Sequence, residues 1–472
     1  MSFTLLITGM VVFSLSHKSA AVYLFFTTLV GIYLGISYWI GIFGRPFNME
    51  KHVGLRKTFA QYKPTVDVYL PCCGEPIEIL ENTYKHVRGL RWPEGKIHVY
   101  VLDDGGDARV AMLADRYEFN YISRSNRGEL KKAGNIRHAF TKTYGEFILI
   151  LDADFCPRPD MLEEMIPYFA NDERIAIVQT PQFFEVTDEM TWMQKGSSYV
   201  QELFYRMVQV NRDTWGASIC VGTCAVYRRQ ALEKRGGTYP IAYSEDLHTG
   251  WQALADGYEV KYIPLNLSAG ACPESMSAYF VQQTRWCTGS TSLLTSKKFW
   301  DNPMPIMQRL CYLSGGLYYF ATAASVFFTP LPALYVVWFY PQHIFWYNYI
   351  FSLPSFIFGT VIVALWGKHK FGAYVLSSRQ VSYYAHFYAL MDKFKGSMIA
   401  WIPTGDTKAM KAVKRYFDFK DCMFAWASIT TALALIGAAL SMKSLVDWNY
   451  YPLIFFAVFH YWISIRAFKE EA

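Results

Sequence analysis

Long apolar runs flank a central block of the chain that carries its acidic, turn-like motifs. A helix that crosses a bilayer needs roughly 20 mostly apolar residues, because the hydrocarbon core is about 30 Å thick. We therefore expect about six spans, formed by Phe3–Ser14, Ala20–Phe43, Leu310–Phe328, Ile350–Trp366, Asp421–Leu440 and Tyr451–Ile465. The first run is short for a span, and the aromatic stretch 331–349 could contain one more crossing.

Composition and charge favour a membrane protein and argue against a nucleic-acid partner. Charged residues make up 18% of the chain and hydrophobic residues 52%, whereas soluble domains contain roughly 25% charged residues. Arg45, Lys51, Arg56 and Lys57 follow the second apolar run, so the positive-inside rule places the central block in the cytosol. The net charge of +6 comes without a long Lys/Arg run. The nine cysteines lack zinc-site spacing, and we expect reduced thiols.

Short apolar segments alternate with helix-length stretches between residues 60 and 270. We expect strands at 66–70, 97–102, 146–151 and 175–179, in a parallel sheet covered on both faces. Ligands bind such sheets beyond the carboxyl ends of the strands. Because several acidic motifs follow directly on these strands, we expect them to share one edge of the sheet.

Asp152 and Asp154 follow the third expected strand with one alanine between them. Two carboxylates at this spacing can present oxygens to one Mg²⁺ or Mn²⁺ ion that also holds a diphosphate. A solvated turn is the alternative interpretation of such a pair.

Two further motifs suit a nucleotide. Asp103 and Asp104 end the second expected strand before two glycines, and an Asp there can accept hydrogen bonds from a base or ribose. Lys131 and Lys132 open an expected helix, whose N-terminus favours phosphate. The alternatives are a loop with capping acids and a solvated basic turn.

The motif Ser244, Glu245, Asp246 begins another expected helix. Asp246 could cap that helix, or it could remove a proton from an attacking hydroxyl as a general base. His248 is a nearby competitor for that role.

Residues 282–286 read Gln-Gln-Thr-Arg-Trp. The Arg285 guanidinium suits diphosphate oxygens, and the Trp286 indole offers a flat face to a sugar ring. An interfacial helix anchor would also use Arg and Trp.

Together and in this order, the motifs resemble those of processive family 2 glycosyltransferases, the group of cellulose, hyaluronan and chitin synthases. The closer similarity is to bacterial cellulose synthase catalytic subunits, and Val66–Pro76, Lys132–Asn135 and Thr180–Phe184 carry it. The resemblance implies a cytosolic α/β GT-A domain, Rossmann-like, inserted between transmembrane helices with amphipathic interface helices. It also implies a UDP-sugar donor and Mg²⁺ or Mn²⁺.

By position, the resemblance assigns roles to individual residues. Catalysis falls to Asp246 with Glu245, and the metal to Asp154 and Asp152. The residues assigned to UDP are Glu75, Asp103, Lys132, Asp152 and Arg285. Those assigned to the acceptor are Gln282, Trp286, Cys220 and Thr223, and Thr404 is assigned to gating.

The sequence departs from the family pattern in several places. Ser244 stands where the family has Thr, and Cys220 lies one place early in its segment. The position of the gating loop, Trp401–Lys408, reads WIPTGDTK. The chain stops soon after its last apolar run, so we expect no C-terminal cyclic-di-GMP-binding domain.

The resemblance implies three regions. These are an N-terminal transmembrane hairpin (1–44), a GT-A domain with interface helices (45–300), and a transmembrane channel region (301–472). The last would include an interface helix at 381–401 and the gating loop at 401–408. We expect a multi-pass protein of the plasma (inner) membrane with its catalytic domain in the cytosol.

The function implied is a processive β-glucan synthase that polymerises glucose from UDP-glucose with inversion, in β-1,4 or mixed β-1,3/1,4 linkage. Its partners would be the UDP-sugar, the nascent polysaccharide and the lipid bilayer. The alternatives are a chitin- or hyaluronan-type synthase that uses UDP-GlcNAc, and a non-processive transferase that loads a lipid. A transporter or scaffold with a decayed transferase domain is a further alternative. Linkage, accessory subunits and oligomeric state stay open.

Overall fold

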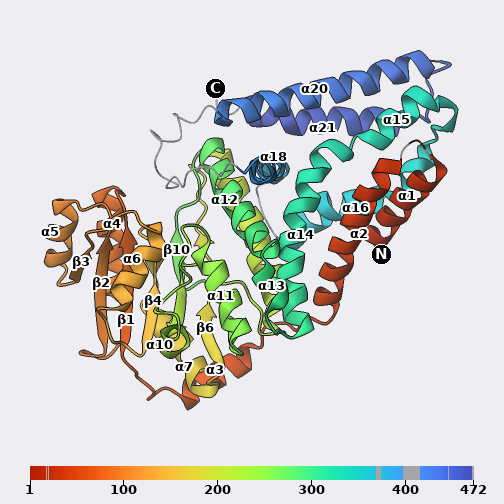
Figure 1. Ribbon diagram of the computed structural model, residues 1–472. Helices are drawn as coiled ribbons and strands as arrows, with labels where there is room; N and C mark the ends of the chain where they lie inside the picture. Colours follow the sequence, from red (N-terminus) through yellow and green to blue (C-terminus); the bar gives the residue numbers. More distant parts are fainter. Residues whose placement is uncertain (18, 20, 368–373, 397–414, 445, 470–472) are drawn as a thin grey trace.

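The computed structural model describes residues 1–17, 19, 21–367, 374–396, 415–444 and 446–469. A domain built around a β-sheet lies on one side of the molecule and a bundle of long helices on the other (Figure 1). Helices α12 (Met276–Leu294) and α18 (Tyr374–Phe394) lie between the two and pack against each other. Thr404 and the rest of the expected gating loop lie outside the described residues.

The main sheet has seven strands, and four of them are those expected from the sequence. In spatial order they are β3 (Asn120–Ser123), β2 (Ile97–Asp103), β1 (Val66–Cys72), β4 (Phe147–Ile150), β8 (Ala225–Arg228), β6 (Ile175–Gln179) and β9 (Glu259–Tyr262). Strand β1 pairs in parallel with β2 and β4, and its last residue, Cys72, lies opposite Asp103.

The four predicted strands run parallel as expected, but β8, which the sequence did not predict, runs antiparallel to both β4 and β6. This strand is only four residues long and ends on Arg228, so apolar patterning does not reveal it. Its reversal has a consequence for the site. The loop that precedes β8 lies at the same edge as the ends of the parallel strands.

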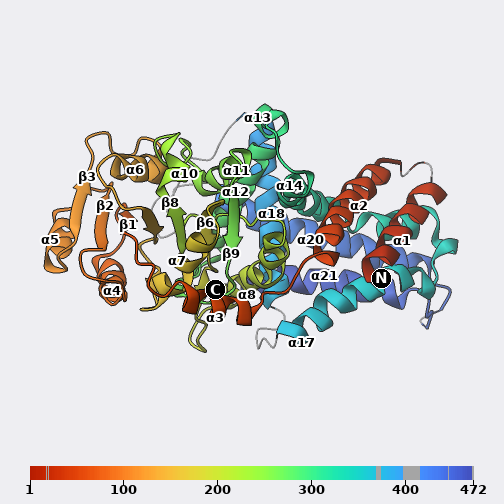
Figure 2. The ribbon, with the colours of Figure 1, turned by 90° about the horizontal axis from the view of Figure 1, so that it is seen from below.

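Alternation along the strands builds two cores, one on each face of the sheet, because successive side chains of a strand point to opposite faces. Val66, Val68 and Leu70 of β1 belong to one core, and Tyr69 belongs to the other. Helices α4 (Ile77–Arg88), α5 (Ala108–Arg116) and α7 (Met161–Asn171) cover the first face. Helices α6 (Lys131–Phe140), α10 (Arg229–Glu233) and α11 (Glu245–Ala255) cover the second (Figure 2).

A second, small sheet joins segments that follow the main strands. Strand β10 (Ser268–Gly270) pairs with β5 (Cys156–Pro157) and β7 (Phe183–Phe184). Because β5 begins two residues after Asp154, this sheet holds the end of the acidic loop in place.

Four helices are long and apolar enough to cross a membrane within the described part of the chain. They are Val22–Ile42, Ile306–Phe339, Asp418–Ser441 and Tyr451–Phe468. Two shorter apolar helices, Ser2–Ser16 and Leu353–Gly367, accompany them. The stretch 331–349 begins as helix α15 (Leu331–Phe339), which continues α14 (Ile306–Phe328).

The remaining helices complete the two halves of the molecule. Their bounds are α1 (Ser2–Ser16), α2 (Ala21–Ile42), α3 (Met49–Thr58), α8 (Trp192–Leu203), α9 (Val210–Asp213), α13 (Lys297–Asp301), α16 (Leu353–Ile357), α17 (Val363–Gly367), α20 (Arg415–Ser441) and α21 (Tyr451–Lys469). A π-helical stretch, Phe204–Gln209, joins α8 to α9. Helix α18 packs on α8, α12 and α14, so it touches both halves.

We predict that the buried pair of Asp67 and Arg229 stabilises the sheet domain strongly. The Arg229 Nη2 donates to Asp67 Oδ2 at 2.8 Å, and its Nε donates to the Gly145 carbonyl. Arg229→Met leaves the Asp67 carboxylate buried without its cation, which should lower the free energy of unfolding by about 3–5 kcal/mol. Guanidinium unfolding followed by near-ultraviolet circular dichroism in detergent measures this loss.

The matched control is Arg116→Met, because Arg116 forms an exposed ion pair with Glu81. That variant should lose no more than about 1 kcal/mol. Equal losses in the two variants would contradict the assignment.

Candidate active site

Acidic residues from several elements meet at one edge of the main sheet. Asp103 ends β2, and Asp152 follows β4 after one further residue. The loop before antiparallel β8 supplies Gly222 to the same edge, and the start of α11 supplies Asp246. The sequence-based expectation that the acid motifs share an edge is confirmed.

Lys132 is the cation at the centre of this cluster. It lies in the first turn of α6, and its ammonium donates to Asp152 Oδ1 and, at 2.8 Å, to the Gly222 carbonyl. Burial opposes its charge, but the carboxylates of Asp152 and Glu245 outweigh that effect and raise the pKa of Lys132 above its ordinary value. Lys132 therefore stays charged and joins three separate segments.

The carboxylates exceed the cations around Asp154. Burial and then the charge of Asp152 raise the pKa of Asp154 to about 7. Burial likewise raises the pKa of Glu75, with Asp152 and Asp103 adding to the effect. Like charges held together in a buried place indicate a site that a cation would stabilise.

The donor set around Asp152 and Asp154 fits a divalent cation that shares its ligands with a substrate. No group of three or more His, Cys, Asp or Glu side chains capable of holding a metal occurs among the described residues. A protein that supplies only two carboxylates leaves the remaining positions to phosphate oxygens and water, as Mg²⁺ sites of nucleotide enzymes do.

Asp246 lies at the start of α11, against the backbone of Gly222. A Cβ atom on Gly222 would lie 2.9 Å from Asp246 Oδ2, so only glycine allows this approach. Asp246 Oδ1 accepts a hydrogen bond from the Leu247 N–H at 2.7 Å, which leaves Oδ2 on the side of Gly222. Burial and then the neighbouring Glu245 carboxylate raise the pKa of Asp246. A carboxylate with a raised pKa is suited to accept a proton.

The competing base His248 is not suited to that task. Its side chain is buried, and its Nε2 lies 3.2 Å from Ser292 Oγ. Burial lowers the pKa of His248 to about 4. Its ring packs against Tyr239, so it belongs to the core beneath α11.

Helix α12 carries the Gln-Gln-Thr-Arg-Trp motif past the start of α11. A Cβ on Gly289 would collide with Ser244 Oγ, so the two helices touch at this glycine. Burial raises the pKa of Glu245, and the charges of Lys132 and Arg285 oppose that rise. Gln282 Oε1 is buried and has no hydrogen-bond partner among the described residues. Trp286 is half-buried on the same helix.

Asp103, assigned to the nucleotide from the sequence, closes its own loop. Its Oδ1 accepts from the N–H groups of Gly105 and Gly106, and its Oδ2 accepts from the Asp107 N–H and the Tyr121 hydroxyl. Only 1% of the residue is exposed. Its contact with a nucleobase stays a prediction, while its visible role is to shape the turn after β2.

Cys220 and Thr223, assigned to the acceptor, are both buried. The Cys220 sulfur lies 3.0 Å from the Tyr227 hydroxyl, and burial raises the pKa of its thiol to about 12. Thr223 Oγ1 accepts a hydrogen bond from the Asp152 N–H at 2.8 Å. In this structure Thr223 holds the acidic loop through the backbone N–H of Asp152. Its contact with an acceptor stays a prediction.

Sequence reasoning missed three residues that shape this site. Gly222 contributes its carbonyl oxygen and a backbone face that carries no side chain. Its positive φ of 78°, which favours glycine, cannot be read from the sequence. Arg124 pairs with Asp104 at 2.6 Å and removes that carboxylate from the free acids. The Tyr312 hydroxyl and the Cys220 side chain both lie close to Gly250 of α11.

Comparison with known proteins agrees with this geometry. The family described as Glycosyl transferase family 2 matches residues 67–236. The cellulose synthase catalytic subunit [UDP-forming] of Xanthomonas axonopodis pv. citri (strain 306) is 33% identical over 265 residues, which are 54% of this chain and 36% of the relative. The chain carries a cellulose-synthase-like family 2 glycosyltransferase domain.

Two further comparisons define how far the likeness extends. Cellulose synthase 1 catalytic subunit [UDP-forming] of Komagataeibacter xylinus is 33% identical over 289 residues, 60% of this chain and 38% of the relative. The chain thus spans well under half the length of these curated relatives. A solved mannosyltransferase from Pyrobaculum calidifontis, in complex with GDP-Man and Mn²⁺, has a TM-score of 0.52 at 16% identity. It covers 76% of this chain and 97% of its own, which confirms the GT-A fold.

We predict that Gly222→Ala inactivates the site while the protein still folds. A Cβ at this left-handed position is strained and would push Asp246 from its place. We expect sugar transfer to fall by about 10²-fold, the effect of a small displacement of a reacting group. Transfer assays and thermal unfolding of the same preparation separate the two effects.

Gly257→Ala is the matched control, because Gly257 also has a positive φ but a Cβ there meets nothing within 4 Å. Its activity should match that of the wild type. A fully active Gly222→Ala protein would contradict the close approach of the loop to Asp246.

We also predict that protons compete with the cation at Asp154. Since the pKa of this carboxyl is about 7, the affinity for Mn²⁺ in the presence of UDP should rise as pH rises. The slope should approach about tenfold per pH unit below about pH 7 and flatten above it. Calorimetric titration across this range measures the slope, and Asp154→Asn should remove both the slope and most of the affinity.

Proposed function

We propose that the protein is a membrane polysaccharide synthase that transfers sugar from a UDP-sugar to the end of a growing β-glycan. Glucose is the sugar we propose first, with UDP-glucose as donor. The catalytic domain would face the cytosol, and the polymer would leave between the membrane helices. The cationic residues that follow α2, from Arg45 to Lys57, support that orientation.

The observation that carries the proposal is the position of Asp246. Its carboxylate lies beside Gly222, whose carbonyl accepts from Lys132, and Lys132 also holds Asp152. Only Gly222 thus separates the proton acceptor Asp246 from Lys132, the cation that suits a diphosphate. A glycosyl transfer with inversion needs both groups at one carbon.

In the proposed reaction the acceptor hydroxyl oxygen forms a bond to the anomeric carbon while the bond from that carbon to the diphosphate breaks. Asp246 receives the hydroxyl proton, and the electron pair of the broken bond leaves with UDP. Lys132 and Arg285 hold positive charge near the departing diphosphate. A divalent cation, when bound at Asp152 and Asp154, would neutralise part of the diphosphate charge.

Burial is what makes the Asp246 carboxylate an effective base. An exposed Asp has a pKa of about 3.9 and accepts protons weakly near neutral pH. Burial and the Glu245 charge raise the pKa of Asp246 and bring it closer to the working pH. Glu245 thereby has a supporting role without touching the substrate.

The comparisons support the choice of donor and metal. The relatives from Xanthomonas and Komagataeibacter are named as UDP-forming cellulose synthases, and the solved mannosyltransferase holds Mn²⁺. We therefore propose Glu75, Asp103, Lys132, Asp152 and Arg285 for UDP, with Mg²⁺ or Mn²⁺ at Asp152 and Asp154. The acceptor would contact Gln282 and Trp286 on α12.

We propose the same three regions for the whole chain. Residues 1–44 would form the membrane hairpin, 45–300 the transferase with its interface helices, and 301–472 the channel region. Helices α12 and α18 between the sheet domain and the long apolar helices support this division.

We predict that Asp246→Asn abolishes polymer formation from labelled UDP-glucose in the presence of Mn²⁺. The amide keeps the shape of the carboxylate but cannot take the proton, so the rate should fall by about 10²–10⁴-fold. High-mass product is counted and digested with linkage-specific glucanases. UDP binding should survive in the variant.

Asp115→Asn, at an exposed position of α5, is the matched control and should stay fully active. Polymer from UDP-GlcNAc alone would move the protein to the chitin- or hyaluronan-type synthases. Transfer of a single sugar to lipid would overturn the processive mechanism, and a failure to bind UDP would indicate a scaffold.

A further inference from the structure

One loop, residues 219–224, contacts two charged groups of the candidate site at once. The Gly222 carbonyl accepts a hydrogen bond from the Lys132 ammonium at 2.8 Å. The other face of the Gly222 backbone lies against the Asp246 carboxylate. The position of this loop therefore decides whether the cation and the proposed base lie next to each other.

Backbone pairing does not hold this loop. Residues 219–224 lie between α9 and β8, outside the described helices and strands, and most of them are buried. Buried backbone N–H and C=O groups need partners, since an unpaired one costs about as much free energy as a lost hydrogen bond. Two glutamine side chains from other elements supply several of these partners.

Gln209 holds the start of the loop with a pair of hydrogen bonds. Its Nε2 donates to the Ile219 carbonyl at 2.7 Å, and its Oε1 accepts from the Ile219 N–H at 2.9 Å. The pair fixes the orientation of the amide, because a reversed amide would place its NH₂ group against the Ile219 N–H. Gln209 is completely buried. One side chain thus binds both polar groups of one residue, as a paired antiparallel strand does.

Gln179 holds the end of the loop in a similar way. It is the last residue of β6 and is completely buried. Its Oε1 accepts from the Val221 N–H at 3.0 Å, and its Nε2 donates to the Thr223 carbonyl at 2.8 Å. These two residues flank Gly222. The Gln179 amide therefore fixes the backbone on both sides of the glycine that meets Lys132.

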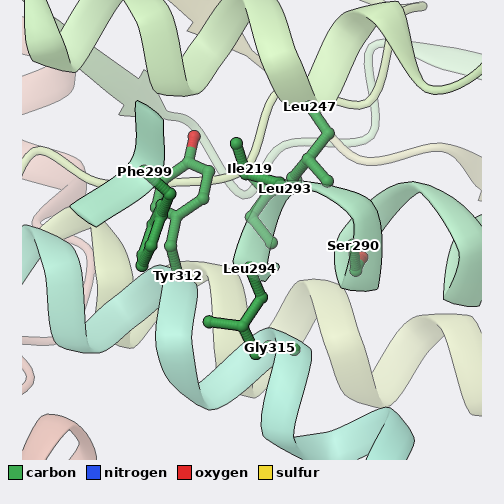
Figure 3. Close-up of a pocket in the computed structure, with 9 residues that line it drawn as sticks. Ile219, Leu247, Ser290, Leu293, Leu294, Phe299, Tyr312 and Gly315 are labelled. Carbon is green, nitrogen blue, oxygen red and sulfur yellow. The ribbon is translucent and has the colours of Figure 1, made fainter. Parts of the chain in front are cut away.

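The residue that Gln209 holds also packs beside the helix of the base. The Ile219 side chain lines the same small pocket as Leu247 of α11 and Leu293 of α12 (Figure 3). Leu247 directly follows Asp246, and its N–H donates to Asp246 Oδ1 at 2.7 Å. A shift of Ile219 would therefore reach the base through α11 as well as through the loop.

Gln209 belongs to a segment that packs on the long helices. It ends the π-helical stretch Phe204–Gln209, which follows α8 and precedes α9. Helix α8 packs on α18, and α9 packs on α2, one of the helices long enough to cross a membrane. π-Helical stretches are rare and often occur at functional sites. Gln209 thus joins this helical segment to the loop beside the base.

We propose that Gln209 and Gln179 are positioning residues of the transfer reaction, which hold residues 219–224 so that Gly222 meets both Lys132 and Asp246. The inference rests on the proposed function and deepens it. Each glutamine acts through the backbone of the loop and not on the substrate. Because one amide comes from the sheet and the other from the helical segment, the base keeps its place only while both parts keep their relative position.

The first test is Gln209→Met in the full-length protein, because methionine fills a similar space but forms neither hydrogen bond with Ile219. We expect kcat for transfer from labelled UDP-glucose to fall at least about tenfold, since a small displacement of a reacting group is enough for such a loss. The Kd for UDP with Mn²⁺ should change little, because Lys132 keeps Asp152. Gln230→Met, at an exposed position of α10, is the matched control and should keep the wild-type kcat.

Gln209→Glu distinguishes positioning from a general loss of packing. A glutamic acid side chain has the shape of glutamine, and its protonated form can both donate to the Ile219 carbonyl and accept from the Ile219 N–H. The ionised form cannot donate. The kcat of Gln209→Glu relative to that of the wild type should therefore rise as pH falls from about 9 to about 6, since burial keeps such a group protonated near neutral pH. The same ratio for Gln209→Met should stay constant.

A further measurement follows the loop without sugar transfer. Cys220 lies in the loop, and only 1% of the residue is exposed. Iodoacetamide should label Cys220 slowly in the wild type and at least about tenfold faster in Gln209→Met and in Gln179→Met, as expected when a loop loses the hydrogen bonds that keep it closed. Peptide mass spectrometry measures the rates. Cys73, which is exposed, is the internal reference and should react equally in all proteins.

The inference and the proposed function fail in different ways. A wild-type kcat in Gln209→Met, or wild-type labelling of Cys220 in both methionine variants, would overturn only the inference. If Gln209→Met does not fold, a constant kcat ratio for Gln209→Glu across the pH range would overturn it. A wild-type protein that transfers sugar from no UDP-sugar would overturn the proposed function, and the labelling of Cys220 would then decide whether the two amides hold the loop.

Discussion

The site depends on one half-buried ammonium group. Lys132 joins the loop after β4 to the loop before β8, because it donates to Asp152 and to the Gly222 carbonyl. Without that cation, the carboxylates of Asp152, Glu245 and Asp246 would repel one another in a place with little water. The antiparallel strand β8 makes the contact possible, since its reversed direction brings the start of the strand to the edge where β4 ends.

At this edge of the sheet, carboxylates outnumber cations, so the negative charge is only partly neutralised. The raised pKa of Asp154, caused first by burial and then by Asp152, reports that excess. A diphosphate alone would add more negative charge, so a substrate of that kind needs a divalent cation with it. In the proposed function, the burial of these acids would couple metal binding to nucleotide binding.

Patterning of apolar residues predicted most of the fold. Strands β1, β2, β4 and β6 and the helices that follow them come from periodicities that burial imposes directly. Strand β8 was not predicted, because a run of four residues that ends on Arg228 is too short to show a periodicity. The split of the sheet into two cores was predictable, as Val68 and Tyr69 show by pointing to opposite faces.

The candidate site was predictable to the level of residue type and no further. Asp152 could be selected because it follows an apolar strand, where side chains of a sheet edge gather. Asp246 could be selected because it begins an expected helix. The capture of Asp103 by its own loop could not, since backbone N–H groups at hydrogen-bond distance leave no mark in the sequence.

Close packing at three glycines positions the base, in addition to its own hydrogen bond. Gly222 and Gly289 each meet the first turn of α11 where a Cβ would collide, and Gly250 meets Tyr312 farther along the helix. A helix held on three sides by close backbone contacts has little freedom to adjust to different acceptors. The donor side, bound by Lys132 and the acidic loop, is equally constrained. In the proposed function, selection among acceptors would therefore fall to the side chains of α12, because they can change without moving the base.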